Sequence, residues 1–368
     1  MRNDFEQLHQ TGLALLRNGE LEKSEIIFRQ ILSSIPTDIA AFNNLGLALL
    51  GQKKYDEAVD VYQKAINLDE NVAPLYHNLG LSFHRLGQLE NAVKSYRSAL
   101  LINPDYPDVL QNLGAALKDI GNKSAAVLCY QRLLELKPDD INIKYMMDSL
   151  TGESHQKEAP KEYVAQLFDD YADRFENQLV TMLHYHIPKK MKQAFTFLVQ
   201  NETLKFSDVL DLGCGTGLVA EEFRSMADRM TGVDLSFKML EKAQKKNLYN
   251  RLYHDGLEEF IANSNRRYDL VLAADVFVYV GKLDRIFELL LKKMTKGGYF
   301  LFSTEDSLDG RDFSLLTTSR YGHSPVYIQS LSCQNNFLIR LCMPTVIRKE
   351  RDEELRGNLY ILQFLPSD

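Results

Sequence analysis

The first 140 residues repeat a pattern of apolar and small positions with a period of 34 residues. Glycine, alanine and tyrosine each recur at that interval, in the sets Gly46, Gly80 and Gly114; Ala58, Ala92 and Ala126; and Tyr62, Tyr96 and Tyr130. Apolar residues at helical spacing, with a small residue at a fixed place, predict pairs of helices that approach closely. Pro104 and Pro138 fit the end of the second helix of a pair. We expect four such repeats, over 5–38, 39–72, 73–106 and 107–140, and a capping helix over 141–150.

The second half of the chain has a different pattern. Residues 151–162 are polar and break the helical periodicity, so we expect a linker there. A helix is predicted from residue 163, and from residue 206 short apolar runs alternate with helical segments. Such alternation predicts a parallel sheet with right-handed crossovers. The strands expected are 209–212, 230–234, 270–274 and 299–303, followed by an antiparallel hairpin over 337–347 and 358–364.

These positions resemble those of tetratricopeptide repeats. The first copy is more degenerate, with Ser24 and Phe28 in the alanine and tyrosine slots, and Glu70 occupies the proline slot of the second copy. Such arrays form a superhelix with a concave groove that binds peptide segments. Asn44, Asn78 and Asn112 recur at the same position and resemble the asparagine ladder of O-GlcNAc transferase repeats. An amide both donates and accepts, so this row is a candidate peptide-binding ladder. The alternative is that each asparagine bonds to groups between the helices.

A glycine-rich turn follows the first expected strand of the second half. Residues 209–217 read Val-Leu-Asp-Leu-Gly-Cys-Gly-Thr-Gly, and Asp234 ends the next apolar run. Glycines in a turn between a strand and a helix let a ligand approach the backbone N–H groups. A carboxylate at the second strand end suits two ribose hydroxyls. The dinucleotide fingerprint needs a third glycine where this chain has Leu218, which argues against nicotinamide chemistry.

The turn resembles motif I of class I S-adenosylmethionine-dependent methyltransferases, and later segments match that family in order. The resemblance implies a two-domain chain, in which an all-α tetratricopeptide superhelix (5–150, with its cap) and the linker (151–162) precede an α/β Rossmann-like domain (163–368) with a seven-stranded mixed sheet. It implies S-adenosylmethionine as cofactor and S-adenosylhomocysteine as product. The cofactor contacts it implies are Tyr171 as a lid, Asp211, Gly213, Cys214, Gly215, Gly217, Asp234, Leu235, Asp255, Gly256 and Asp275.

Candidates for chemistry lie at strand ends and in the insertion before the final hairpin. We expect His323 as a general base, with Asp275 and Tyr321 as further catalytic residues. We expect Arg320 and Tyr185 to contact the methyl acceptor. The alternative for the segment 319–324 is that its polar residues order a loop.

Composition limits the remaining choices. The net charge of −7 disfavours nucleic acid as a partner, and no apolar run has the length of a membrane span. The four cysteines have neither metal nor disulfide spacing, and His184 and His186 have no acidic or thiol partner nearby, so we expect no metal. With no visible signal peptide, these features predict a cytoplasmic protein.

Three functions follow from these predictions. The first is a methyltransferase whose repeats recruit a peptide or protein substrate or partner. The second is a small-molecule methyltransferase whose repeats assemble a complex. The third is a scaffold that binds the cofactor without turnover.

Overall fold

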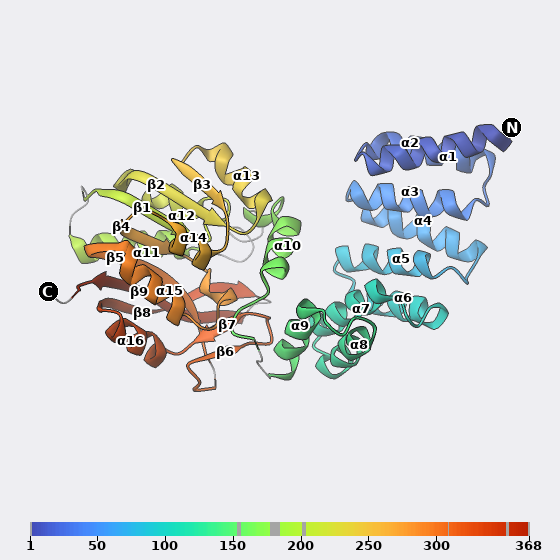
Figure 1. Ribbon diagram of the computed structural model, residues 1–368. Coiled ribbons are helices and arrows are strands. Elements are labelled where there is room, and N and C mark those ends of the chain that lie inside the picture. Colours follow the sequence, from blue (N-terminus) through green and yellow to red (C-terminus); the bar gives the residue numbers. More distant parts are fainter. Residues whose placement is uncertain are drawn as a thin grey trace. The chain divides into compact units, whose positions relative to one another are not determined.

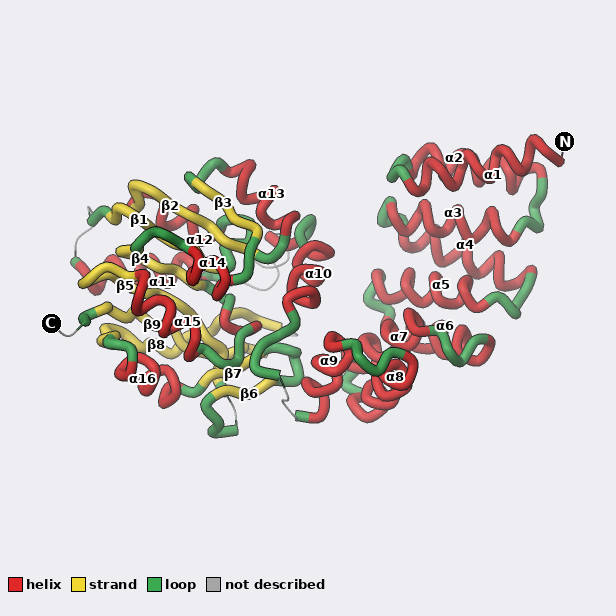
Figure 2. Tube along the Cα trace, viewed as in Figure 1, coloured by secondary structure: helices red, strands yellow, loops and turns green. Residues whose placement is uncertain are grey.

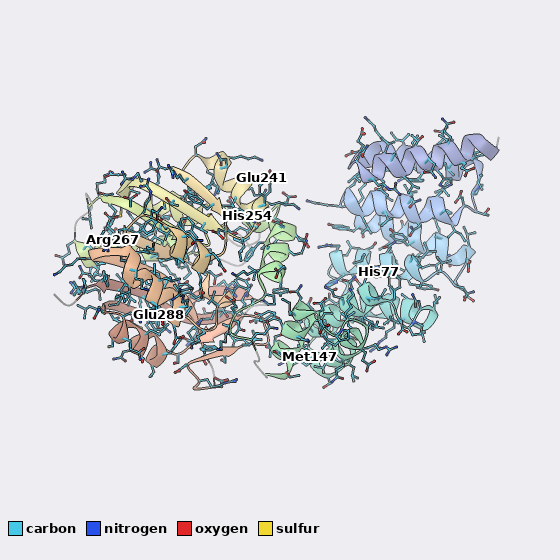
Figure 3. The ribbon with its side chains drawn as sticks, in the orientation of Figure 1. His77, Met147, Glu241, His254, Arg267 and Glu288 are labelled. Atoms are coloured by element: carbon cyan, nitrogen blue, oxygen red, sulfur yellow. The ribbon has the colours of Figure 1, made fainter. Side chains whose placement is uncertain are left out.

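The computed structural model describes residues 2–152, 156–176, 185–200, 204–307, 309–350 and 353–366. The chain divides into two compact units, Met1–Met147 and Asp148–Asp368 (Figure 1). The boundary between them falls within one helix, α9 (Ile141–Thr151), close to the residue Met147 that Figure 3 labels.

The first unit consists of helices and short loops, as Figure 2 shows. A glycine in the first helix of a pair faces a buried tyrosine of the second. A Cβ on Gly46 would lie 2.3 Å from the Tyr62 ring, and one on Gly80 would lie 2.5 Å from the Tyr96 ring. The close approach predicted from the repeat is therefore confirmed. The helices ahead of α9 are α1 (Arg2–Arg17), α2 (Leu21–Ser34), α3 (Ile39–Gly51), α4 (Tyr55–Leu68), α5 (Ala73–Arg85), α6 (Leu89–Ile102), α7 (Pro107–Asp119) and α8 (Lys123–Leu136).

The second unit is built on a mixed sheet with strand order β3-β2-β1-β4-β5-β7-β6, in which β9 also pairs with β5 and β8. The strands β1 to β5 run parallel, and β9 lies antiparallel to β5. The described residues form the seven expected strands and two short ones, β6 and β7, from the insertion before the hairpin. The strands are β1 (Phe206–Leu212), β2 (Ala227–Asp234), β3 (Arg251–His254), β4 (Tyr268–Ala273), β5 (Met294–Asp306), β6 (Phe313–Leu315), β7 (Tyr321–His323), β8 (Phe337–Glu350) and β9 (Glu353–Phe364).

Alternate residues of the strands enter two separate apolar cores, one on each face of the sheet. Leu210 and Leu212 of β1 pack with α14, α15 and α16, whereas Val209 packs with α11 and α12. The bounds of the helices and 3-10 turns of this unit are α10 (Lys161–Tyr171), α11 (Ile187–Val199), α12 (Leu218–Phe223), η2 (Arg224–Met226), α13 (Phe237–Lys246), α14 (Leu257–Asn263), η3 (Phe277–Tyr279), α15 (Asp284–Lys293) and α16 (Pro325–Gln334).

The described part of the predicted linker is fastened to the second unit. The amides of Gly281 and Lys282 donate to the Lys157 carbonyl at 2.8 and 2.9 Å, and the Ala159 amide donates to the Tyr279 carbonyl at 2.8 Å. Residues 153–155 of the linker lie outside the described residues. The chain therefore enters α10 already bound to the segment that follows β4.

Candidate functional site

The glycine turn joins β1 to α12 at the carboxyl edge of the parallel strands. Gly213, Gly215 and Gly217 have φ angles of 63°, 52° and 92°, a left-handed backbone that other residues adopt at a cost. A Cβ on Gly213 would lie 2.5 Å from Cγ2 of Val276, so the end of β4 packs directly on the turn. A Cβ on Gly215 would meet no atom within 4 Å. The turn thus presents bare backbone to open space at Gly215.

The carboxylate of Asp234, at the end of β2, is held by this turn. Its Oδ2 accepts from the Gly215 amide and its Oδ1 from the Ser236 amide, both at 2.8 Å. Burial raises the pKa of Asp234, and the backbone amides of Ser236 and Gly215 oppose that rise. A carboxylate offers about four lone-pair sites, so Asp234 can accept from a further donor beside these backbone amides.

The other residues predicted around the nucleoside come together beside Asp234. The Asp255 amide donates to the Asp234 carbonyl at 3.2 Å, and the Gly256 amide donates to Asp255 Oδ1 at 2.8 Å. The ring of His254, labelled in Figure 3, is bonded through Nε2 to the Leu235 carbonyl at 2.9 Å. The ends of β2 and β3 are therefore joined at this edge.

Asp211 and Cys214 are both buried beneath the turn. Tyr249, which sequence reasoning missed, donates its hydroxyl to Asp211 Oδ2 at 2.6 Å. Burial raises the pKa of Asp211 to about 7 and that of the Cys214 thiol well above its usual value. Asp211 Oδ1 has no hydrogen-bond partner among the described residues. A buried thiol of this kind packs rather than reacts.

Helix α10 lies against α13, beside the glycine turn. Asp169 of α10 accepts from Ser236 Oγ at 2.6 Å and from the Lys238 amide at 3.2 Å, which places its carboxylate at the first turn of α13. Lys246 at the other end of α13 pairs with Glu176 at 2.6 Å. The predicted lid residue Tyr171 contacts the Phe175 ring edge-on, with centroids 5.6 Å apart.

On the opposite side of the turn, the end of β4 carries a buried charge cluster. Arg348 of β8 bonds to both carboxylate oxygens of Asp275 at 3.1 Å and to Glu305 Oε1 at 2.5 Å. The side chains of Arg348 and Glu305 are 1% and 2% exposed, and that of Asp275 is 18% exposed. Burial raises the pKa of Glu305, and the charges of Arg348 and Arg320 oppose that rise.

Tyr185 is buried in the apolar core that contains Val209 of β1. Burial raises the pKa of the Tyr185 phenol well above its usual value. The negative charges of Asp275 and Asp211 add to this rise, and the positive charge of Arg348 opposes it. Of these charged neighbours, Asp211 lies in β1, Asp275 just after β4 and Arg348 in β8. Of the predicted site residues, Tyr185 and Asp275 are thus electrostatic neighbours, whereas Arg320 acts on Glu305. Arg348 joins the cluster without a signal in the sequence motifs.

His323 and Tyr321 lie in β7, and both are fully buried. His323 Nε2 lies 2.9 and 3.0 Å from the carbonyls of Val280 and Gly281, so this nitrogen carries the ring proton. Burial lowers the pKa of His323 to about 4. The Tyr321 hydroxyl donates to the Gln156 carbonyl at 2.9 Å. These contacts order the segments around β7, in line with the alternative for residues 319–324, so we propose no catalytic role for either side chain.

Two of the three recurring asparagines, Asn78 and Asn112, link neighbouring repeats. Asn78 Nδ2 donates to Asn43 Oδ1, and Asn112 Nδ2 is bonded to Nε2 of His77, which Figure 3 labels, both at 2.9 Å. Asn78 is buried, whereas Asn44 and Asn112 are half-buried. One amide hydrogen of Asn78 and of Asn112 is therefore used inside the array.

Two negative findings apply to the described residues. No three His, Cys, Asp or Glu side chains gather there as metal ligands. His184, one of the two histidines weighed in the sequence, falls outside them. None of the described helices combines the length and apolarity needed to cross a membrane.

Family models match both halves of the chain. A model described as a methyltransferase domain matches residues 182–337. Models described as TPR repeat and tetratricopeptide repeat match residues 46–87, 81–121 and 107–140.

Among curated proteins, ubiquinone biosynthesis O-methyltransferase of Coxiella burnetii is 28% identical over 142 residues, which are 37% of this chain and 59% of that protein. Malonyl-acyl-carrier-protein O-methyltransferase of Priestia megaterium is 33% identical over 140 residues, which are 36% of this chain and 49% of that protein. The chain thus spans about half to three fifths of the length of these relatives.

Solved structures resemble each half. The magnesium protoporphyrin IX methyltransferase of Synechocystis PCC 6803 with bound S-adenosylmethionine covers 55% of this chain and 96% of its own, at 17% identity and a TM-score of 0.42. A thermophilic tetratricopeptide protein of Thermus thermophilus covers 40% of this chain and 81% of its own, at 21% identity and a TM-score of 0.36. The family models show that this chain carries a methyltransferase domain in its second half and tetratricopeptide repeats in its first half.

Proposed function

We propose that this protein transfers a methyl group from S-adenosylmethionine to an acceptor in the cytoplasm. The observation that carries the proposal is the Asp234 carboxylate, fixed by the Gly215 and Ser236 amides beside a turn of bare backbone. Both curated relatives described above are named as O-methyltransferases, which supports methyl transfer. The four cysteines are unpaired, in keeping with a reducing compartment.

The residues present fit this cofactor. Asp234 keeps acceptor capacity toward the ribose hydroxyls, and Asp255 follows the end of the next strand, where the adenine would lie. The open space above Gly215 admits a ligand against the backbone. The buried Asp211 Oδ1 has an unused acceptor for a donor such as an ammonium group.

When bound, the cofactor supplies an activated methyl group on a sulfonium cation. The protein's task is then to align the acceptor and to exclude water, because little charge stabilisation is needed at sulfur. Helix α10, with Tyr171, serves as the cover, and its Asp169 bonds fasten it to α13. Asp275 faces the acceptor and has Tyr185 as an electrostatic neighbour, and Arg320 acts on Glu305 of the same charge cluster.

We further propose that the repeats bind a peptide or protein, either the substrate or another partner. Tetratricopeptide repeats generally have this role. Asn44 and Asn112 are half-buried, so each presents part of its amide for an extended chain. If the acceptor is instead a small molecule, removal of residues 1–140 leaves the rate of transfer to it unchanged.

Methyl transfer is tested by incubating the purified protein with methyl-labelled S-adenosylmethionine and fractions of a cell lysate. The expected result is label on one class of acceptor, lost in Asp234→Ala and kept in Asp228→Ala, an exposed residue at the other end of β2. Cofactor binding without label in any fraction would refute the enzyme and support a scaffold.

A further inference from the structure

The charge cluster at the end of β4 has a specific geometry. Nη1 of Arg348 contacts both oxygens of Asp275, and Nη2 donates to Glu305 Oε1. The planar guanidinium thus holds the two carboxylates in a fixed relation through two different nitrogens, which the single nitrogen of a lysine ammonium does not. Of the three side chains, only Asp275 reaches solvent to an appreciable degree, at 18%.

The backbone at Asp275 is also held in an unusual state. Its φ angle is 57°, left-handed for a residue with a side chain, and its amide donates to Ser303 Oγ of β5 at 2.9 Å. Such strain persists only where surrounding contacts over-determine it. Contacts from β5 and β8 thus fix both the backbone and the carboxylate of Asp275.

The placement of Asp275 relates it to the glycine turn. The next residue, Val276, fills the space where a side chain on Gly213 would lie. In the strand order, β1 lies between β2, which ends at Asp234, and β4, which precedes Asp275. Asp275 therefore lies on the far side of the turn from Asp234. Tyr185 has both Asp211 and Asp275 as electrostatic neighbours.

We propose that Arg348 is a positioning residue, which orients the Asp275 carboxylate to accept a proton from the methyl acceptor. The proposal rests on the proposed function and adds the class of acceptor, a hydroxyl or an amine. An ionised carboxylate acceptor has no proton to give, and it would meet the negative charges of Asp275 and Glu305.

The transfer step balances with these groups. The acceptor's O–H or N–H bond breaks, and its proton passes to an Asp275 oxygen. The electron pair of the acceptor forms the new bond to the methyl carbon, and the pair of the broken methyl–sulfur bond remains on sulfur. Asp275 thus acts as the general base, and Arg348 acts through it.

The variants that test this role are Arg348→Lys, which keeps the charge but has one nitrogen in place of the two that join Asp275 to Glu305, Asp275→Asn and the double variant. Arg340→Met is the control, on an exposed residue of the same strand. The probe is tritiated S-adenosylmethionine with the lysate fraction that wild type labels. S-adenosylhomocysteine affinity, measured by calorimetry, reports whether each variant keeps a folded cofactor site.

We expect Arg348→Lys to lower the rate of labelling about 10- to 100-fold, with affinity for S-adenosylhomocysteine unchanged within about threefold. Arg340→Met labels at the wild-type rate. Because Arg348 acts through Asp275, the double variant is no slower than Asp275→Asn. A wild-type rate in Arg348→Lys, or losses that multiply in the double variant, would overturn the positioning role.

The acceptor class is read from the product. Mild alkali releases volatile labelled methanol from carboxyl methyl esters, but it leaves methyl ethers and methylamines intact. Alkali-stable label supports the proposal, and released methanol overturns it. If wild type binds S-adenosylhomocysteine but labels no fraction, the proposed function itself has failed, and this inference fails with it.

Discussion

Replacement of Gly215 by alanine separates the role of the glycine turn in folding from its role in binding. Gly215 has a φ angle of 52°, and a Cβ there meets no atom within 4 Å. Gly297, near the start of strand β5, is a matched control, because its φ is 83° and a Cβ there would also meet no atom within 4 Å. Left-handed backbone costs a residue with a Cβ about 1–2 kcal/mol, and reduced entropy of the unfolded chain returns about 0.5 kcal/mol.

Both Gly215→Ala and Gly297→Ala should therefore lose about 1 kcal/mol of stability, without a packing clash. Only Gly215→Ala places a methyl group where we propose that the cofactor approaches the backbone, on the residue whose amide donates to Asp234. We expect its affinity for S-adenosylmethionine to fall at least about 30-fold, which corresponds to about 2 kcal/mol. Gly297 lies at the opposite edge of the sheet from the glycine turn, so Gly297→Ala should leave the affinity for S-adenosylmethionine unchanged.

The assay pairs urea unfolding, which gives the free energy of unfolding, with calorimetric titration of S-adenosylmethionine. If Gly215→Ala binds S-adenosylmethionine as tightly as wild type, the role proposed for Gly215 is refuted, because the open space there would then not be part of the binding site. Equal loss of affinity in Gly297→Ala would be just as damaging, since it would attribute the effect to general destabilisation.

Three further predictions concern stability, read from urea unfolding curves. Gly80→Ala should cost about 1–3 kcal/mol, because its Cβ would lie 2.5 Å from the buried Tyr96 ring; a loss below about 0.5 kcal/mol would show that the ring moves aside. His323 has a pKa near 4 in the folded protein and about 6.5 when unfolded, so its contribution is full above pH 6.5 and is lost as the pH falls towards 4. Between pH 7.5 and pH 5, wild type should lose about 2 kcal/mol more than His323→Gln, and equal losses would argue against a buried neutral ring. A chain that begins at Ile141 should be more stable than one that begins at Gln156, because Ser149 of α9 is buried and bonded to Ser319 at 3.0 Å; equal stability would show that α9 is dispensable to the second unit.

The parts of the molecule that the sequence predicts well are those encoded by local spacing. The 34-residue period places Gly46 against Tyr62, only 16 positions along the chain, and the structure pairs them. The glycine turn is likewise encoded in one short segment, since left-handed angles at alternate positions select glycine.

The residues that sequence reasoning missed depend on contacts between distant strands. Arg348 reaches Asp275 across 73 positions, and Tyr249 reaches Asp211 across 38. Both pairs form only once strand order and register are set. At His323 the residue type alone favoured the prediction of a general base. The pairing of β7 with β5, which the sequence pattern did not predict, places this side chain in a buried position.

The proposed function depends most directly on Asp234 as the carboxylate that holds the cofactor. Calorimetric titration of wild type, Asp234→Ala and Asp228→Ala with S-adenosylmethionine tests this claim. We predict binding to wild type and Asp228→Ala, and a loss of at least about 30-fold in Asp234→Ala, since two charge-assisted hydrogen bonds to the ribose are removed. Equal, tight binding by all three proteins would contradict the site described above.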